Sequence, residues 1–296
     1  MNVASIGTFD GVHLGHQSVL KMMLEYSRRH DMHPIAVTFR NHPLTIIAPE
    51  RAPKALTAIE EKTKLLEESG VTAIVLDFDE KLKSTSAADW MKRMKDEYDV
   101  STLVLGYDNT FGCDGRNMSA EDYKRLGERL GMEILIAEEI KGVSSSAIRE
   151  AVERGNMEKA GEMLGRPYSL TAEIVMGNHI GRTIGFPTAN MRLPEGMALP
   201  KPGVFAAMVK LHSEAIEHPA MVNIGSHPTV KREDGIVIET HLIDWEGDLY
   251  GKEITVKFLK RLRDEKKFGS LEELKYQLTG DKEVARSISE RFPGMR

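Results

Sequence analysis

The sequence predicts an α/β protein in two parts: a parallel β-sheet covered by helices on both faces, then an antiparallel β structure closed by a C-terminal helix. In the first half, short apolar runs alternate with stretches of helical length, the pattern of right-handed strand–helix–strand crossovers. In the second half, short strands follow one another between turn dipeptides, which is typical of a sandwich or a barrel. The 296 residues are enough for two domains of ordinary size.

Five strands and five helices are expected in the first half. The strand patterns span 2–7, 33–39, 71–78, 101–106 and 133–137, and the helix patterns span 15–29, 57–70, 86–98, 119–131 and 146–155. Thr57 with Glu60 forms a capping-box pattern at the start of the second helix, and Gly70 closes that helix. Ser86 with Asp89 opens the third helix. Strands and helices of these lengths predict a parallel sheet whose ligands bind beyond the carboxyl ends of the strands.

The second half changes pattern near residues 160–168, so we predict domains at 1–164 and 165–296. Its strand patterns span 172–177, 203–211, 218–225, 235–245 and 253–262, and a helix pattern covers 270–292. The dipeptides Asp234-Gly235 and Glu246-Gly247 separate strands as turns do.

Composition limits the function classes. The net charge of −5 does not imply general affinity for nucleic acid or anionic membranes. Cys113 is the single cysteine, so a disulfide framework is excluded and a reducing compartment is expected. No apolar run approaches the roughly 18–20 residues that a membrane-spanning helix needs. Met1 leads directly into a strand pattern without the features of a signal peptide. We therefore expect a cytoplasmic enzyme or binding protein.

The first chemical motif is GTFDGVHLGH, residues 7–16, between the first strand and its helix. It has neither the Gly-x-Gly-x-x-Gly spacing of dinucleotide sites nor the Gly-Lys-Ser/Thr of a P-loop. His13 and His16 are three residues apart at a helix N-terminus, where N–H groups and the helix dipole favour phosphate. Gly15 removes a side chain between them, so a ligand can approach the backbone. Two histidines that only cap or pack are the alternative, but the coincident glycines and strand end favour phosphate chemistry.

A second donor-rich segment lies at residues 144–149. Ser144, Ser145 and Ser146 precede a helix, where hydroxyl groups cap the helix or bind phosphate oxygens. Arg149 follows in the first turn, where a cation opposes the helix dipole. Because a role in helix stability explains Arg149 poorly, we predict that it binds a phosphate.

The second half carries GRTIGFPTAN, residues 181–190. Thr188 and Asn190 are two residues apart, so an extended segment points both oxygens to one face. A hydroxyl and an amide carbonyl are hard ligands suited to Mg²⁺ that also holds ATP phosphates. Gly181 and Gly185 allow the loop to lie against a nucleotide, and Arg182 is within reach of a phosphate.

Glu239 is the candidate base of the second half. It interrupts an apolar strand pattern and shares a face with His241, whereas Ile238 and Thr240 share the other face. A carboxylate in a semi-apolar pocket is suited to accept a proton from a hydroxyl group. A solvated glutamate at the rim of the sheet is the alternative.

These motifs carry a resemblance to known enzymes. His-x-Gly-His after a first strand resembles the nucleotidylyltransferase superfamily, and the longer motif resembles the prokaryotic bifunctional riboflavin kinase/FMN adenylyltransferase (FAD synthetase) family. The segments TFRNHP, GYDNTFG and VSSSAIRE, at 38–43, 106–112 and 143–150, are similar to further elements of that family. The second half resembles its riboflavin kinase module through 181–190 and 249–268. Asn109 departs from the family pattern, which usually has an aromatic residue there.

The resemblance implies a Rossmann-like nucleotidylyltransferase domain with a parallel sheet, then an antiparallel β-barrel riboflavin kinase domain with a C-terminal helix. It implies phosphorylation of riboflavin to FMN in the second domain and adenylylation of FMN to FAD, with release of pyrophosphate, in the first. ATP is then the co-substrate and Mg²⁺ the metal. Small-molecule substrates, no nucleic acid, no membrane, and a monomer or weak homo-oligomer are expected.

The same resemblance assigns roles to individual residues. The catalytic residues are His13, His16 and Glu239, with Glu239 deprotonating the ribityl 5′-hydroxyl. Metal binding falls to Thr188 and Asn190, and flavin binding to Phe111 and Arg263. Nucleotide or phosphate binding falls to Gly7, Phe9, Gly15, Asp108, Ser145, Ser146, Arg149, Gly181, Arg182 and Gly185.

Two alternatives belong to other function classes. The chain is then either a single-activity adenylyltransferase whose barrel only senses flavin, or a non-catalytic flavin carrier. Intact Thr188, Asn190 and Glu239 argue against the first, and no feature of the sequence favours the second.

Overall fold

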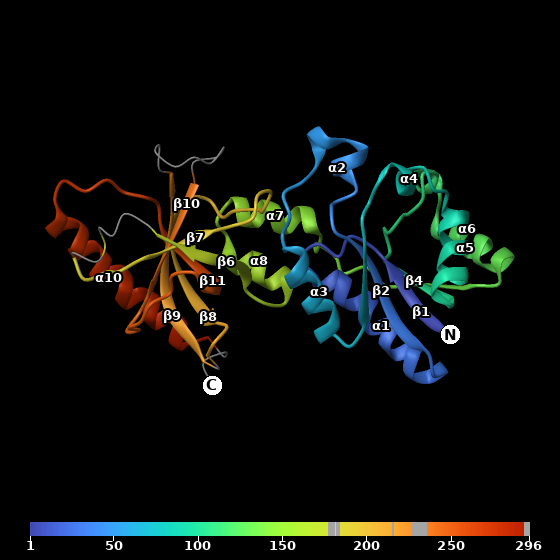
Figure 1. Ribbon diagram of the computed structural model, residues 1–296, viewed down its shortest axis with the longest axis horizontal. Helices are drawn as coiled ribbons and strands as arrows, with labels where there is room; N and C mark the ends of the chain where they lie inside the picture. Colours follow the sequence, from blue (N-terminus) through green and yellow to red (C-terminus); the bar gives the residue numbers. More distant parts are fainter. Residues whose placement is uncertain (177–180, 182–183, 215, 227–235, 293–296) are drawn as a thin grey trace. The chain divides into compact units, whose positions relative to one another are not determined.

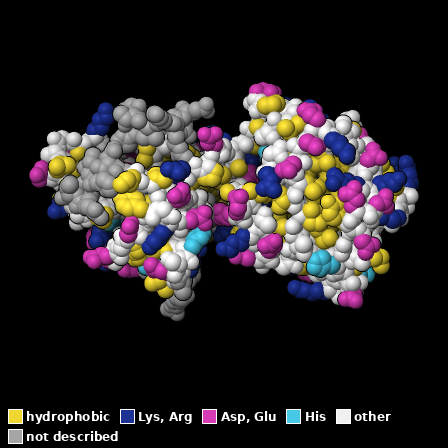
Figure 2. Space-filling view, viewed as in Figure 1, with side chains coloured by type: hydrophobic (Ala, Val, Ile, Leu, Met, Phe, Trp, Pro, Cys, Tyr) yellow, Lys and Arg dark blue, Asp and Glu magenta, His cyan; other side chains and the backbone are white. Residues whose placement is uncertain are grey.

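A computed structural model of the chain describes residues 1–176, 181, 184–214, 216–226 and 236–292 (Figure 1). The chain divides into two compact units, Met1–Ser145 and Ser146–Arg296, and each is described by itself. On the face drawn in Figure 2, Lys and Arg side chains are interspersed with Asp and Glu side chains. In the part of the chain that the structure describes, no helix combines the length and apolar character needed to cross a membrane.

The first unit contains a five-stranded parallel sheet, as predicted. Its strands are β1 (Asn2–Ile6), β2 (His33–Phe39), β3 (Thr72–Leu76), β4 (Val100–Leu105) and β5 (Glu133–Ile136). They are ordered β3-β2-β1-β4-β5, and every neighbouring pair is parallel. The chain adds β2 and β3 on one side of β1, and then adds β4 and β5 on the other side. The order of the strands therefore changes direction between β1 and β4. At such a switch point the loops after the two strands diverge and leave a crevice for a ligand.

Helices cover this sheet at the predicted positions 15–29, 57–70, 86–98 and 119–131, and two short helices between them were not predicted. They are α1 (Leu14–His30), α2 (Leu44–Ile47), α3 (Ile59–Glu68), α4 (Glu80–Lys83), α5 (Ala87–Tyr98) and α6 (Ala120–Leu130), with 3₁₀ turns at Pro49–Arg51 and Gly115–Asn117. The Ser86 cap is confirmed, since its side chain accepts the N–H of Asp89. The predicted Thr57 cap is wrong: Ala58 is the N-cap of α3, and the Thr57 hydroxyl is used elsewhere.

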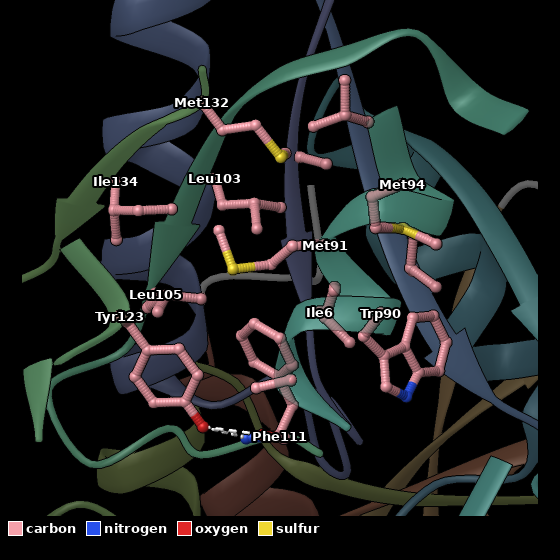
Figure 3. Close-up of a cluster of buried hydrophobic side chains, with 14 of the residues drawn as sticks. Ile6, Trp90, Met91, Met94, Leu103, Leu105, Phe111, Tyr123, Met132 and Ile134 are labelled. Atoms are coloured by element: carbon pink, nitrogen blue, oxygen red, sulfur yellow. Dashed lines mark hydrogen bonds between the residues drawn. The ribbon is translucent and has the colours of Figure 1, made fainter. Parts of the chain in front are cut away.

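Alternate strand residues fill two separate cores, one on each face of the sheet. Ile6 packs with Trp90 and Met91 of α5 in the first core (Figure 3). Val3, three residues earlier, packs with Leu20 of α1 in the second core. Successive side chains of a strand point to opposite faces, so a sheet covered by helices on both faces buries both sets.

The second unit is a closed antiparallel barrel, which decides between the two architectures that the strand pattern allows. Its strands are β6 (Tyr168–Val175), β7 (Ala189–Arg192), β8 (Gly203–Leu211), β9 (Glu217–Ser226), β10 (Ile236–Leu242) and β11 (Glu253–Arg263). They close in the order β10-β7-β6-β11-β8-β9. Before the barrel come α7 (Ser145–Glu153) and α8 (Met157–Leu164), and the sequence pattern did not predict α8.

The barrel interior is packed with apolar side chains. Val222, Ile238 and Val256, from three different strands, are completely buried. The C-terminal helix α10 (Leu271–Glu290) begins at the Ser270 cap, as the sequence pattern predicts. Its residue Ala285 packs on the outside of the barrel against Met221 and other apolar side chains. The interior of the small barrel is therefore filled by its own apolar side chains.

Candidate active sites

The loop between β1 and α1 has an unusual backbone that tertiary contacts hold in place. Phe9 and Val12 have positive φ angles of 46° and 39°, which side chains disfavour. The Asp10 carboxylate accepts N–H groups from Leu56 and Thr57 at 2.9 and 3.2 Å. The Thr57 hydroxyl in turn accepts the N–H of Gly11 at 3.1 Å. This bond engages the Thr57 hydroxyl in the loop instead of at the start of α3.

His13 and His16 form a stacked pair at the N-terminus of α1. Their ring centroids are 3.7 Å apart with an angle of 17° between the planes. His13 is the N-cap, and its Nδ1 accepts the backbone N–H of His16 at 3.3 Å. Neutral His13 therefore carries its proton on Nε2, which is a donor. The N–H groups of the first helical turn lack acceptors within a helix, so donors suited to an anion gather here.

His16 lies in an environment that keeps it neutral. Among the described residues, its buried Nδ1 atom has no hydrogen-bond partner. Burial lowers the pKa of His16 well below its usual value, and the charges of His13 and Lys62 lower it further. His16 is then uncharged at neutral pH and donates a hydrogen bond without first taking up a proton.

Gly15 makes room for the His13 ring. A Cβ atom added at Gly15 would lie 3.1 Å from Cε1 of His13, which is closer than ordinary contact. The missing side chain at Gly15 was expected to let a ligand approach the backbone. The space that it leaves lies next to the imidazole of His13.

We predict that Gly15→Ala displaces the His13 ring by a few tenths of an ångström and slows FAD formation from FMN by about tenfold, since small misplacements of reacting groups are costly. FMN formation from riboflavin should not change. Gly280→Ala in α10 is the matched control, because a Cβ there meets no atom within 4 Å. Equal FAD formation by both variants would show that the His13 ring tolerates the methyl group.

The loop after β4 lies beside the end of β1. The Asn109 side chain donates to the carbonyl oxygen of Ile6 at 2.5 Å, which gives this departure from the family pattern a structural role. Gly106 and the exposed Asp108 precede it in the same loop. The loop therefore lies at the switch point between β1 and β4, beside the strand that leads into Gly7, Phe9 and the histidines.

Phe111 lies in the core, not on an exposed surface. Its ring is 9% exposed and packs on Tyr123 at a centroid distance of 4.7 Å (Figure 3). The Tyr123 hydroxyl accepts the N–H of Phe111 at 2.8 Å. Its predicted contact with flavin remains a prediction.

The serine-rich segment contributes one contact within the first unit. The Ser145 hydroxyl donates to the carbonyl oxygen of Asp10 at 2.9 Å, so it touches the histidine-bearing loop. Ser146 is exposed and Arg149 is half-buried in α7, within the second unit. Their contacts with phosphate remain predictions.

Sequence reasoning missed Asp10, Thr57 and Lys62 in the first unit. Lys62 is only 7% exposed, and α3 packs on β3 with Ile59, Lys62 and Leu66 at helical spacing. A lysine in the apolar stripe of a helix was the available signal, because lysine is rarely buried without a specific partner.

In the second unit, four predicted site residues meet in one pocket of about 280 Å³. They come from three separate segments of the chain, and they are Gly181, Thr188, Glu239 and Arg263. Phe186, Phe268 and Leu278 add apolar walls. Gly185, with φ of 84°, lies in the same loop as Gly181, and Arg182 lies outside the described residues.

Glu239 and the predicted metal ligands share one face of the sheet. Glu239 stands directly opposite Asn190 in the antiparallel β7–β10 pair, and directly paired residues point to the same side. Thr188 precedes Asn190 by two residues and lines the pocket with Glu239. Among the described residues, the Glu239 side chain has no hydrogen-bond or ion-pair partner. Its carboxylate is thus available to a ligand.

Arg263 is held in the pocket by α10. Its Nε and Nη2 atoms contact Oδ2 of Asp281 at 2.9 and 2.7 Å, and Asp281 is buried. The guanidinium carbon also lies 5.9 Å from the centre of the Phe268 ring. A fixed cation beside an aromatic ring suits a planar, electron-rich ligand.

His241 connects β10 to the loop that carries Thr188. Its Nδ1 lies 2.8 Å from the carbonyl oxygen of Pro187, so Nδ1 carries the proton and donates. Burial lowers the pKa of His241, which favours the neutral ring. This bond fixes the residue next to Thr188.

A second pocket of about 590 Å³ opens on the other side of Thr188. Trp245, Leu249 and Tyr250 from the β10–β11 connection line it, together with Thr240 on the opposite face of β10 from Glu239. Thr188 therefore borders both pockets. Sequence reasoning missed this second pocket, although Trp245 and Tyr250 in a turn-rich segment were a usable signal.

Comparisons with known proteins match the two parts of the chain to two enzyme families. The FAD synthetase family model matches residues 1–149, and the riboflavin kinase family model matches residues 164–289. The bifunctional riboflavin kinase/FMN adenylyltransferase of Bacillus subtilis is 33% identical over 290 residues, covering 96% of this chain and 91% of the relative. That of Escherichia coli K12 is 35% identical over 294 residues, covering 97% and 92%.

A solved structure extends the similarity to the whole fold. A Streptococcus pneumoniae crystal structure described as a macrolide-efflux protein has a TM-score of 0.86 and 31% identity, covering 96% of this chain and 93% of the other. The chain is a bifunctional transferase: it phosphorylates riboflavin to FMN with ATP in its C-terminal part and adenylylates FMN to FAD, with release of pyrophosphate, in its N-terminal part. It belongs to the bifunctional riboflavin kinase/FMN adenylyltransferase family.

Proposed function

We propose that the two reactions use separate sites, with the histidine pair serving adenylyl transfer and the 280 Å³ barrel pocket serving the kinase. The observation that carries this proposal is the convergence of Thr188, Glu239 and Arg263, distant in sequence, on one pocket. The residues that we assign to nucleotide or phosphate in the first site are Gly7, Phe9, Gly15, Asp108, Ser145, Ser146 and Arg149.

In adenylyl transfer, a phosphate oxygen of FMN attacks the α-phosphorus of ATP and pyrophosphate leaves. The nucleophile is already an anion, so the protein has no need of a strong base. Its task is to position the groups and stabilise charge on the α-phosphate. Nε2–H of His13 and the neutral ring of His16 are donors for that purpose, and the stacked geometry aligns the rings.

The kinase reaction differs because its nucleophile is a neutral alcohol. The ribityl 5′-hydroxyl attacks the γ-phosphorus of ATP, and ADP leaves. Glu239 accepts the hydroxyl proton as general base. Arg263 and Phe268 bind the flavin in the same pocket, and Trp245 and Tyr250 bind the adenine in the pocket across Thr188. In this arrangement, Glu239 lies between the bound flavin and the phosphates of ATP.

The donor set at Thr188 and Asn190 fits Mg²⁺. A hydroxyl and an amide oxygen are hard ligands, so Thr188 and Asn190 would hold Mg²⁺ together with ATP phosphates. Among the described residues, no group of three or more His, Cys, Asp or Glu side chains forms a metal site, in keeping with a metal held largely by substrate. When bound there, Mg²⁺ would neutralise charge on the β- and γ-phosphates.

We expect Asn190→Ala to raise the Mg²⁺ and ATP concentrations needed for half-maximal FMN formation, because one ligand of the metal is lost. Adenylyl transfer from added FMN should be unaffected. Titrating Mg²⁺ in both assays measures this. Asn223→Ala is the control, since Asn223 also lines the pocket but lies on β9. Parallel loss of both activities in Asn190→Ala would instead mean that Asn190 supports the fold.

The remaining assignments complete the proposal. We assign residues 1–164 and 165–296 to the two domains; the boundary drawn from contacts at Ser145/Ser146 places α7 and α8 with the barrel. Substrates are small molecules, and the interspersed charges in Figure 2 suit a protein without a nucleic-acid surface on that face. A single cysteine suits the reducing cytoplasm. We expect the protein to be a monomer or a weak homo-oligomer.

A further inference from the structure

Lys62 of α3 is a buried cation whose partners are carbonyl oxygens. Its side chain is 7% exposed. Nζ donates to the carbonyl oxygens of Thr8 and Phe39 at 3.0 and 2.7 Å. Among the described residues, no carboxylate lies within ion-pair distance of Nζ. Burying a cation without a paired anion is costly, so its retention calls for a specific role.

Both carbonyl groups lie at the carboxyl ends of two neighbouring strands, β1 and β2. Phe39 is the last residue of β2, and Thr8 follows β1 by two residues. The Thr8 carbonyl oxygen also accepts the Thr38 hydroxyl at 3.0 Å. The next residue, Phe9, holds the disfavoured positive φ of 46°. Two donors on one carbonyl oxygen therefore fix the backbone immediately before the strained position.

The strained residue touches a candidate catalytic side chain. The Phe9 ring is 2% exposed and lies 5.2 Å from the His16 ring, at an angle of 60°. A contact path thus runs from Lys62 through Thr8 and Phe9 to His16. Movement of the Thr8 carbonyl oxygen would move the Phe9 ring and the surface on which His16 packs.

The Lys62 charge also acts on His16 directly. It lowers the pKa of His16, after burial and His13, while Asp10 is the opposite charge that acts on Lys62. Positive potential in a poorly hydrated site strengthens attraction for an anion. The positive charge that opposes protonation of His16 also attracts a polyphosphate beside the His16 ring.

We propose that Lys62 is a positioning residue of adenylyl transfer: it holds the loop that seats His16, and it supplies buried positive charge for the polyphosphate of ATP. This proposal rests on the assignment of His16 to that reaction. Lys62 would then act through the loop and through its field, without itself touching the reacting atoms.

Lys62→Met tests the proposal, because methionine has similar length but neither charge nor donors. We expect kcat for FAD formation from added FMN to fall by at least about tenfold, KM for ATP to rise, and FMN formation from riboflavin to stay unchanged. Lys64→Met on the same helix is the control, since Lys64 is exposed and forms an ion pair with Glu68 at 3.8 Å on the helix surface. It should leave both activities unchanged.

Two further readouts distinguish this role from simple support of the fold. The pKa of His16, followed by NMR with labelled histidine, should rise in Lys62→Met, because burial and His13 still oppose its protonation but the Lys62 charge no longer does. Burial lowers the pKa of Lys62 to about 8. FAD formation by the wild-type enzyme should therefore decline as pH rises through about 8, and Lys62→Arg, which stays charged, should lack that decline.

The results separate this proposal from the one on which it rests. An unchanged His16 pKa and normal FAD kinetics in folded Lys62→Met, beside an inactive His16→Ala, would overturn the role of Lys62 alone. If Lys62→Met does not fold, a wild-type rate that stays flat between pH 7 and 9 would overturn it equally. Normal FAD formation by His16→Ala would remove the assignment of His16 itself.

Discussion

His16→Ala is expected to slow FAD formation from FMN by about a hundredfold or more, the scale of losing one preorganised donor in an active site. FMN formation from riboflavin should remain normal, because Glu239 and its pocket belong to a unit with its own core. FAD formation should fall because His16 lies at the N-terminus of α1, stacked on His13 and held neutral by burial. Separation of FMN and FAD after incubation measures both rates.

His30→Ala is the matched control for this variant. His30 lies at the far end of the same helix, is exposed, and stacks on Tyr26. It removes the same chemical group from α1 without touching the proposed site, so both activities should persist. Wild-type FAD output from His16→Ala would contradict the assignment of the histidine pair to adenylyl transfer.

Glu239→Gln is expected to slow FMN formation by at least about a hundredfold, the low end for removal of a general base. Glutamine keeps the size and hydrogen-bonding capacity of the side chain but cannot accept the hydroxyl proton. The variant should still bind riboflavin and ATP, and it should make FAD from added FMN at the normal rate. Both activities and thermal melting are to be measured on the same preparation.

Glu265→Gln tests whether Glu239→Gln slows FMN formation through loss of a base or through loss of a negative charge, because Glu265 lines the same pocket. It removes an equal charge and should slow FMN formation far less than Glu239→Gln. Near-normal kinase activity in Glu239→Gln would point to a solvated rim glutamate. Loss of both activities with a lower melting temperature would point to a broken buried contact.

Periodicity predicted most of the fold because both units bury their elements in regular ways. Strands such as 33–39 and 101–106 contain uninterrupted apolar stretches, 35–37 and 103–105, because helices cover both faces of their sheet. The α8 helix was missed because its eight residues lie where the pattern changes between the two parts. The Thr57 cap was wrongly predicted because a contact with Gly11, distant in sequence, outweighs the local pattern.

The sequence predicted those site residues whose functional partners lie only two or three positions away along the chain. His13 with His16, and Thr188 with Asn190, are read from spacing alone. Lys62 and Asp10 were not found, since their partners lie 23 to 54 residues away and become neighbours only in the folded sheet. For Phe111 the motif predicts a flavin contact, which stays a prediction, and the sequence did not reveal that its ring packs on Tyr123.

The central proposal is that one chain holds two separate sites, one for each reaction, and a mixing experiment tests it most directly. With riboflavin and Mg·ATP, His16→Ala alone should accumulate FMN, and Glu239→Gln alone should form little of either product. The two variants mixed should produce FAD, because FMN released by one is adenylylated by the other. A mixture that forms no FAD while FMN accumulates, or wild-type FAD output from either variant alone, would contradict the account.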